Sequence, residues 1–121
     1  MTEYRLGEIE MRFADIIWEH EPIASGELVK LAEKELTWNR STTYTILRRL
    51  SERGLFKNEN GQVCSCVTKE EFVGAKSEQF VEETFSGSLP GFLVAFAKRK
   101  KISAKELEEI QEFIEAYKEE V

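Results

Sequence analysis

Hydrophobic residues recur at helical spacing in three segments of the N-terminal half, and short polar breaks separate these segments. The pattern predicts helices over residues 7–19, 25–36 and 40–53. Ser25 can cap the second helix, and Asn39 is a preferred capping residue for the third. The core positions expected in the first two helices are Ile9, Phe13, Ile16 and Ile17, then Leu28, Leu31, Ala32 and Leu36.

The third predicted helix carries different chemistry on its two sides. Thr43, Ile46, Leu47 and Leu50 cluster on one side, which is expected to pack inward. The opposite side is rich in hydroxyl and guanidinium groups, which suit close approach to phosphates and base edges. Its residues are Arg40, Ser41, Tyr44, Thr45 and Arg48, with Thr42 and Arg49 at its border. The alternative is an ordinary solvated face, although such a face would favour Glu and Lys.

A two-stranded hairpin is predicted directly after this helix. Gly54 ends the helix, and Asn60-Gly61 separates two short segments, residues 55–59 and 62–68. Asn-Gly favours the tight type I′ turn of a hairpin. A helix of this kind followed at once by a hairpin is the order of a winged helix-turn-helix, in which the hairpin is the wing. The sequence therefore predicts a winged helix-turn-helix DNA-binding domain over residues 1–68.

Residues 69–121 contain helical patterns without further strands. Thr68 and Ser103 each stand three residues before a Glu, which is the capping-box pattern at a helix start. An apolar stripe along the last helix must be covered, and a second copy of the chain is the economical cover. We predict a helical dimerisation domain; folding of the stripe onto the first domain is the alternative. The expected interface residues are Phe80, Phe85, Phe92, Leu93, Phe96, Leu107, Ile110, Ile114 and Tyr117.

The predicted fold class is therefore mainly α with a small β-hairpin. Several short motifs occur together in this framework: Ile16-Ile17-Trp18, Ser25, Thr42-Thr43, Thr45-Ile46-Leu47-Arg48-Arg49-Leu50 and Arg53-Gly54-Leu55. With these motifs, the chain resembles the penicillinase repressor (BlaI/MecI/CopY) family of bacterial winged-helix repressors over nearly its whole length. The resemblance implies a homodimer that binds an inverted-repeat operator in double-stranded DNA through the third helix and the wing.

The overall charge of −6 is unusual for a nucleic-acid binder, but the charge is unevenly distributed. Between Arg40 and Lys57 there are five cations and one acid, a local net charge of +4. The acidic remainder would repel DNA elsewhere on the protein and limit non-specific adhesion. We expect DNA affinity that falls as salt is added.

The candidate DNA contacts divide into two groups. Those near the start of the third helix are candidates for base edges: Arg40, Ser41, Tyr44 and Thr45. Those expected to bind phosphate are Thr42, Arg48 and Arg49 in the helix, and Lys57 and Asn60 in the wing. Winged helices also serve as protein-interaction modules, so this alternative function stays open.

Cys64 and Cys66 are the only thiols, and on a strand they would point the same way. Two ligands do not make a zinc site, and we predict no metal and no cofactor. Packing of the hairpin on the domain is the preferred explanation. A redox role or a metal shared across the dimer is the alternative.

Enzymatic motifs are lacking. The single histidine, His20, has no neighbouring nucleophile, and the sequence contains neither a glycine-rich phosphate loop nor a His-Glu metal motif. No signal peptide, membrane-length apolar run or disulfide framework is present, so we expect a cytoplasmic protein that is not an enzyme.

The β-lactam-responsive branch of the family implies a sensor protease that leads to cleavage between an Asn and a Phe. The corresponding dipeptide here is Ala95-Phe96, which lacks the Asn and is interpreted as helix core. Release by another protease site, a ligand or an antirepressor partner is the alternative.

Overall fold

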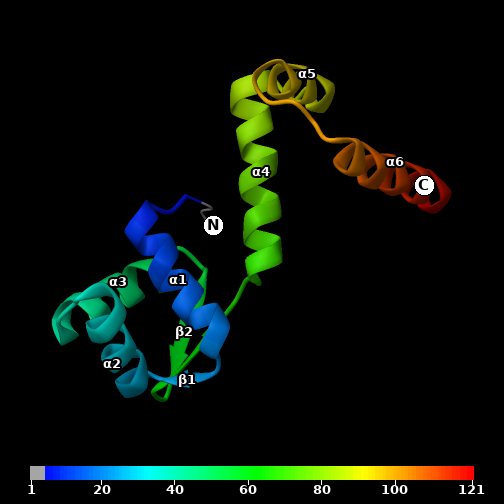
Figure 1. Ribbon diagram of the computed structural model, residues 1–121. Helices are drawn as coiled ribbons and strands as arrows, with labels where there is room; N and C mark the ends of the chain where they lie inside the picture. Colours follow the sequence, from blue (N-terminus) through cyan, green and yellow to red (C-terminus); the bar gives the residue numbers. More distant parts are fainter. Residues whose placement is uncertain (1–4) are drawn as a thin grey trace. The chain divides into compact units, whose positions relative to one another are not determined.

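The computed structural model describes residues 5–121, so residues 1–4 of the first predicted domain lie outside the described part. The chain is mainly helical there, with one small sheet (Figure 1). The helices are α1 (Glu8–His20), α2 (Ser25–Leu36), α3 (Arg40–Glu52), α4 (Lys69–Phe85), α5 (Leu89–Arg99) and α6 (Ala104–Glu120). The strands are β1 (Ile23–Ala24), β2 (Phe56–Glu59) and β3 (Gln62–Ser65). The predicted fold class is confirmed.

The chain forms two compact units, Met1–Glu78 and Gln79–Val121. The break falls inside α4, whereas the sequence analysis placed the domain boundary before this helix. The first turns of α4 belong to the first unit because Phe72 is fully buried there, with its ring 5.6 Å from that of Trp18. Lys69 also forms an ion pair with Asp15 of α1, at 2.9 Å.

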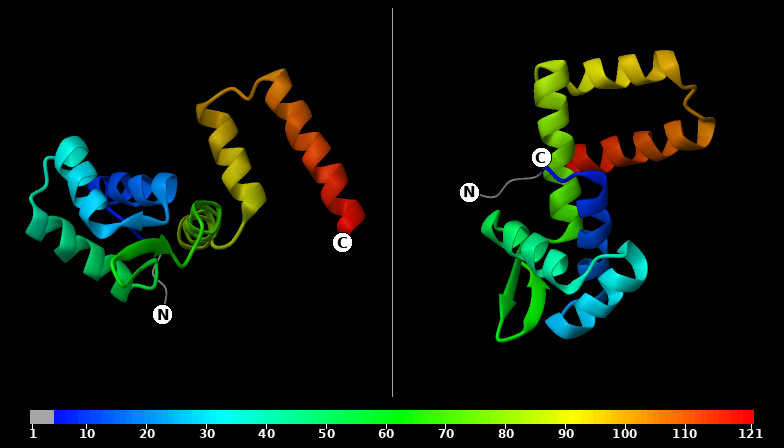
Figure 2. Two further views of the ribbon diagram at one scale, coloured as in Figure 1. Left: turned by 90° about the horizontal axis from the view of Figure 1, so that it is seen from below. Right: turned by 90° about the vertical axis from the view of Figure 1, so that its left-hand side faces the viewer.

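The wing is part of an antiparallel sheet with the strand order β1-β3-β2. The predicted hairpin pairs β2 with β3, and the short β1 adds a third strand by placing Ile23 opposite Val63. Asn60 and Gly61 have φ angles of 54° and 82°, and these two positive values are those of the predicted type I′ turn. In the right-hand view of Figure 2 the hairpin, drawn in green, lies beside α3.

The core of the first unit lies between α1, α2, α3 and the sheet. Its largest fully buried side chains are Phe13, Ile17, Leu28, Leu50, Leu55, Phe56, Val63 and Phe72. Burying each large apolar side chain contributes about 1.5–3 kcal/mol. This core fixes the inner side of α3, where Thr43, Leu47 and Leu50 are buried, and leaves its polar side outward.

Two details of the sequence analysis are wrong. Ile9 is 43% exposed, and the buried positions of α1 begin only at Phe13. Ser25 is the first residue of α2 but does not cap it; Ala24 occupies the N-cap without a side-chain hydrogen bond. The backbone N–H of Ser25 instead donates to the Gly61 carbonyl at 2.8 Å, so the sheet satisfies this donor.

The second unit consists of the end of α4 and the helices α5 and α6. Phe80, Phe85 and Phe92 pack edge to face, with ring centroids 5.6–6.1 Å apart. Ser103 caps α6 through the predicted capping box with Glu106. No side chain of α5 or α6 is fully buried, so this unit lacks a closed core.

Among residues 5–121 no helix combines the length and apolar character needed to cross a membrane.

Candidate nucleic-acid interface

The polar side of α3 is the candidate interface. Arg40, Ser41, Thr45 and Arg48 are exposed, whereas Tyr44 is half-buried. Five of the nine predicted DNA-binding residues therefore share one side of a helix whose other side is fixed by the core. The segment contains no acid until Glu52, in its last turn. This side offers guanidinium and hydroxyl groups to a ligand without a nearby negative charge on the same helix face.

The start of α3 is ordered by Asn39, as predicted. The Asn39 side-chain oxygen accepts from the backbone N–H of Thr42 at 2.8 Å and from the hydroxyl of Ser41 at 3.0 Å. The hydroxyl of Thr43 donates to the Asn39 carbonyl at 3.2 Å. Satisfying donors at a helix start stabilises the first turn. Arg40 and Ser41 are therefore held at a well-defined helix end.

Tyr44 links α3 to the start of α2. Its hydroxyl donates a hydrogen bond to the Ser25 hydroxyl at 3.1 Å, and the guanidinium carbon of Arg40 lies 5.3 Å from its ring centroid. The second distance is within the range of a cation–π contact. Tyr44 is thus held by Ser25 and in turn positions Arg40.

A hollow of about 340 Å³ lies between α3 and strand β2 of the wing. Tyr44, Leu47, Arg48, Ser51 and Asn58 line it, and the hydroxyl of Ser51 donates to the Leu47 carbonyl at 2.8 Å. The sequence analysis missed Ser51 and Asn58 as interface candidates. The sequence signal for Asn58 was weak, because a single Asn in a strand is ordinarily interpreted as polar surface. Only the fold places Asn58 in the same hollow as Arg48.

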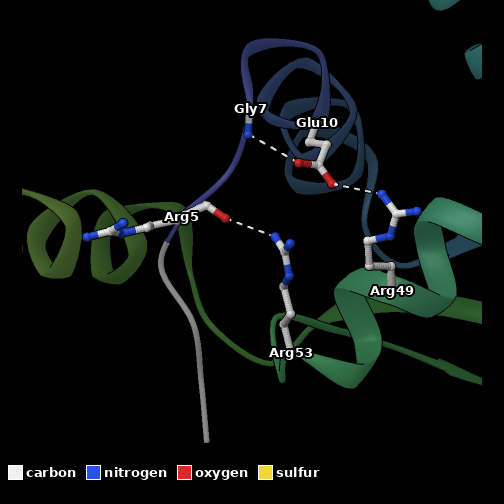
Figure 3. Close-up of polar contacts among 5 residues, drawn as sticks. All are labelled: Arg5, Gly7, Glu10, Arg49 and Arg53. Atoms are coloured by element: carbon white, nitrogen blue, oxygen red, sulfur yellow. Dashed lines mark hydrogen bonds and ion pairs between the residues drawn. The ribbon is translucent and has the colours of Figure 1, made fainter.

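Arg49 and Arg53 reach from α3 to the beginning of the described chain (Figure 3). A terminal nitrogen of Arg49 lies 3.9 Å from the Glu10 carboxylate, and Arg53 donates to the Arg5 carbonyl at 2.9 Å. The other Glu10 oxygen accepts from the Gly7 N–H at 3.2 Å. Arg49 thus helps to hold α3 against α1, and it would have to leave Glu10 to bind a phosphate.

Of the three remaining candidates, Thr42 is half-buried in the first turn of α3, and the other two lie in the wing. Lys57 lies 3.4 Å from Glu59 on the same strand, and this carboxylate raises the pKa of Lys57 above its usual value. Asn60 is exposed at the tip, and the carbonyl of its neighbour Gly61 accepts from the N–H of Ser25. That bond ties the tip of the wing to the start of α2.

The packing explanation for the wing cysteines is wrong for Cys66, which is exposed; Cys64 is half-buried, and both thiols are free. Among residues 5–121 there is no group of three or more His, Cys, Asp or Glu side chains placed to hold a metal ion.

Comparison with known proteins covers almost the whole chain. The sequence model of the family described as "Penicillinase repressor" matches residues 6–116. The chain belongs to the penicillinase repressor family. A penicillinase repressor of Bacillus licheniformis is 25% identical over 118 residues, which span 94% of this chain and 92% of that protein. A penicillinase repressor of Staphylococcus aureus is 25% identical over 104 residues, 83% of this chain and 82% of that protein. The penicillinase repressor family is one of transcriptional regulators, not enzymes, and the expected family is confirmed.

Proposed function

We propose that this member of the penicillinase repressor family is a homodimeric, sequence-specific DNA-binding repressor. In this proposal each protomer inserts α3 into one half-site of an inverted repeat and places the wing along the DNA backbone. The observation that carries the proposal is the exposed, acid-free polar face of α3, which lies beside the wing that carries Lys57. Such a face suits the major groove, where side chains distinguish base edges while flanking cations neutralise phosphates.

The geometry suggests a division of roles. Arg40, Ser41 and Thr45 are exposed on the first two turns and are assigned to base edges, together with the ring edge of Tyr44. Recognition helices of this class contact bases mainly through their N-terminal part.

The hollow between α3 and the wing suits a backbone phosphate. Arg48 supplies a cation on one side and Asn58 an amide on the other. Lys57, Asn60 and Thr42 are assigned to neighbouring phosphates. Arg49, held by Glu10, is assigned first to the position of α3 and only second to DNA.

Dimerisation is proposed from the second unit. Phe80, Leu93, Phe96, Leu107, Ile114 and Tyr117 are between 39% and 57% exposed, and Phe85, Phe92 and Ile110 are half-buried. Exposed apolar surface of this extent on helices without a closed core is typical of a segment stabilised by association. A second copy offers the same surface, and a two-fold dimer would present two α3 helices to the two halves of an inverted repeat.

Selection of oligonucleotides from a random-sequence pool tests the proposal without knowledge of the target gene. The expected product is an inverted repeat whose half-sites are spaced by whole or near-whole turns of DNA. Its affinity should fall steeply with salt. A folded, dimeric protein that enriches no sequence would contradict the proposal and favour the protein-interaction module.

Two substitutions then separate base contact from phosphate contact. Tyr44→Ala should change the selected half-site, because it removes a ring from the base-reading turn and releases Arg40. Lys57→Ala should weaken binding to all sequences evenly. The salt slope, which is the slope of the logarithm of affinity against the logarithm of salt concentration, should become shallower by about 0.9 per half-site. Equal losses on every sequence for both variants would refute this division.

We propose that the repressor is released from DNA by disruption of its dimer. Phe96 is 43% exposed, so the interpretation of Ala95-Phe96 as helix core is wrong for Phe96 in the single chain, although both residues lie within α5. A sensor protease or an antirepressor that disrupts α5 would separate the protomers. A protein cut within residues 89–98 should therefore lose operator affinity, and unchanged affinity after complete cutting would exclude this route.

A further inference from the structure

Cys64 and Cys66 lie on the outer face of the wing. Side chains alternate between the two faces of a strand. Val63 and Val67 are 0% and 9% exposed and point into the core, so the thiols between and beside them point outward. Cys66 is exposed and Cys64 is half-buried.

The segment that carries the thiols is held from several sides. The backbone N–H and the hydroxyl of Ser65 donate to the Glu21 carboxylate at 2.8 and 2.7 Å. The N–H of Cys66 donates to the Leu55 carbonyl at 2.8 Å, and the indole N–H of Trp18 donates to the Val67 carbonyl at 3.0 Å. The thiols cannot turn inward without breaking these bonds. Cys66 is thus presented to solvent in a fixed position.

Lys57 shares this outer face. It is the register partner of Cys64 across the hairpin, and directly opposed side chains have Cβ atoms about 4.5–5.5 Å apart. Cys66 is one diagonal step away, at about 7–8 Å, within reach of a lysine side chain. The pKa of Lys57 is raised first by Glu59 and further by the sulfurs of Cys64 and Cys66, which places its ammonium within electrostatic range of both.

We propose that Cys66 is a modification site through which low-molecular-weight disulfides weaken DNA binding by the wing. The inference rests on the proposed function, because the consequence is read at Lys57 as a phosphate contact. The Cys66 thiolate attacks one sulfur of the small disulfide, a new S–S bond forms, and the original S–S bond breaks. The other half leaves as a thiolate, which takes up a proton from solvent. Cys66 is oxidised to a mixed disulfide and the small molecule is reduced.

The position of the adduct determines its effect. A group attached to Cys66 occupies the face where Lys57 would meet the DNA backbone, and an anionic group repels phosphate as well. Loss of one phosphate contact lowers the salt slope by about 0.9 per half-site, which is about fivefold in affinity at about 0.15 M salt. We expect the anionic adduct to weaken binding by at least about fivefold per half-site at that salt concentration, and dithiothreitol to restore it.

The experiment treats the full-length reduced protein with oxidised glutathione. Intact-mass and peptide analysis locates the adduct, and titration of the selected DNA across salt measures affinity before treatment, after treatment and after reduction. The expected result is one glutathionyl group on Cys66, a lower affinity and a lower slope. Cys66→Ser should bind DNA as the untreated protein does and resist treatment, whereas Cys64→Ser should respond like wild type.

Lys57→Ala provides a second, independent arm. If the adduct acts mainly by removing the Lys57 contact, glutathione treatment should lower the salt slope of this variant clearly less than that of the wild-type protein. A lack of adduct on Cys66, an adduct without loss of affinity, or an equal fall in slope with and without Lys57 would overturn the inference. If instead the proposed function is wrong, the untreated wild-type protein will select no DNA at all. That result is distinct from the three outcomes that overturn the inference.

Discussion

Arg48 and Arg49 are neighbours in α3, yet the structure predicts opposite consequences for their replacement by alanine. Arg48 faces the hollow beside the wing, whereas Arg49 lies 3.9 Å from Glu10 of α1. We expect Arg48→Ala to lower the salt slope of DNA binding by about 0.9 per half-site. That change corresponds to about fivefold in affinity per half-site at about 0.15 M salt. The free energy of unfolding of the Arg48→Ala variant should be almost unchanged.

Arg49→Ala should instead lower the free energy of unfolding. Two unit charges 3.9 Å apart attract by about 4 kcal/mol at an effective dielectric constant of about 20. The side chain of Arg49 is 52% exposed and that of Glu10 17%, so solvent screening and side-chain entropy reduce the net effect to about 1 kcal/mol. Urea denaturation measures this difference, and the salt slope of Arg49→Ala should fall clearly less than that of Arg48→Ala.

The matched controls are Arg48→Lys, which should keep the slope, and Glu10→Gln, which should destabilise the protein about as much as Arg49→Ala. The reasoning would be refuted if Arg49→Ala reduced the slope as much as Arg48→Ala does. Arg49 would then be a phosphate contact, and its ion pair with Glu10 would be incidental.

Three further outcomes are expected. Asn39→Ala should lower the free energy of unfolding by about 1 kcal/mol, because it removes the cap of α3, and Asn39→Asp should retain most of that stability in urea denaturation. Ile114→Asp should convert the dimer to a monomer in sedimentation equilibrium, while the circular dichroism spectrum of the first unit persists. An unchanged dimer dissociation constant would show that the apolar stripe of α6 is not part of the interface. Phe72→Ala should destabilise the first unit by about 3–5 kcal/mol in urea denaturation, because the side chain is fully buried, whereas Phe113→Ala, 64% exposed, should leave that unit unaffected.

Local features of this protein could be predicted from its sequence. The cap at Asn39, the type I′ turn at Asn60-Gly61 and the two capping boxes each depend on residues within three or four positions of one another. Apart from Ile9, the helical periodicity of α1, α2 and α3 correctly predicts which sides of these helices face the core. The polar side of α3 was therefore predictable as a candidate interface from helical periodicity and residue type alone.

Other features depend on contacts between residues far apart in the chain, and only the tertiary structure decides them. The pairing of β1 with β3, the bond from Tyr44 to Ser25 and the ion pair from Arg49 to Glu10 join separate elements, so no local pattern encodes them. Asn58 likewise becomes a candidate contact only when the hairpin folds back beside α3. The sequence determined which helices and turns form, because these are governed by interactions within a few residues. Packing of the core decided which polar side chains meet, since side chains distant in sequence are brought together only when the elements that carry them are fixed against one another.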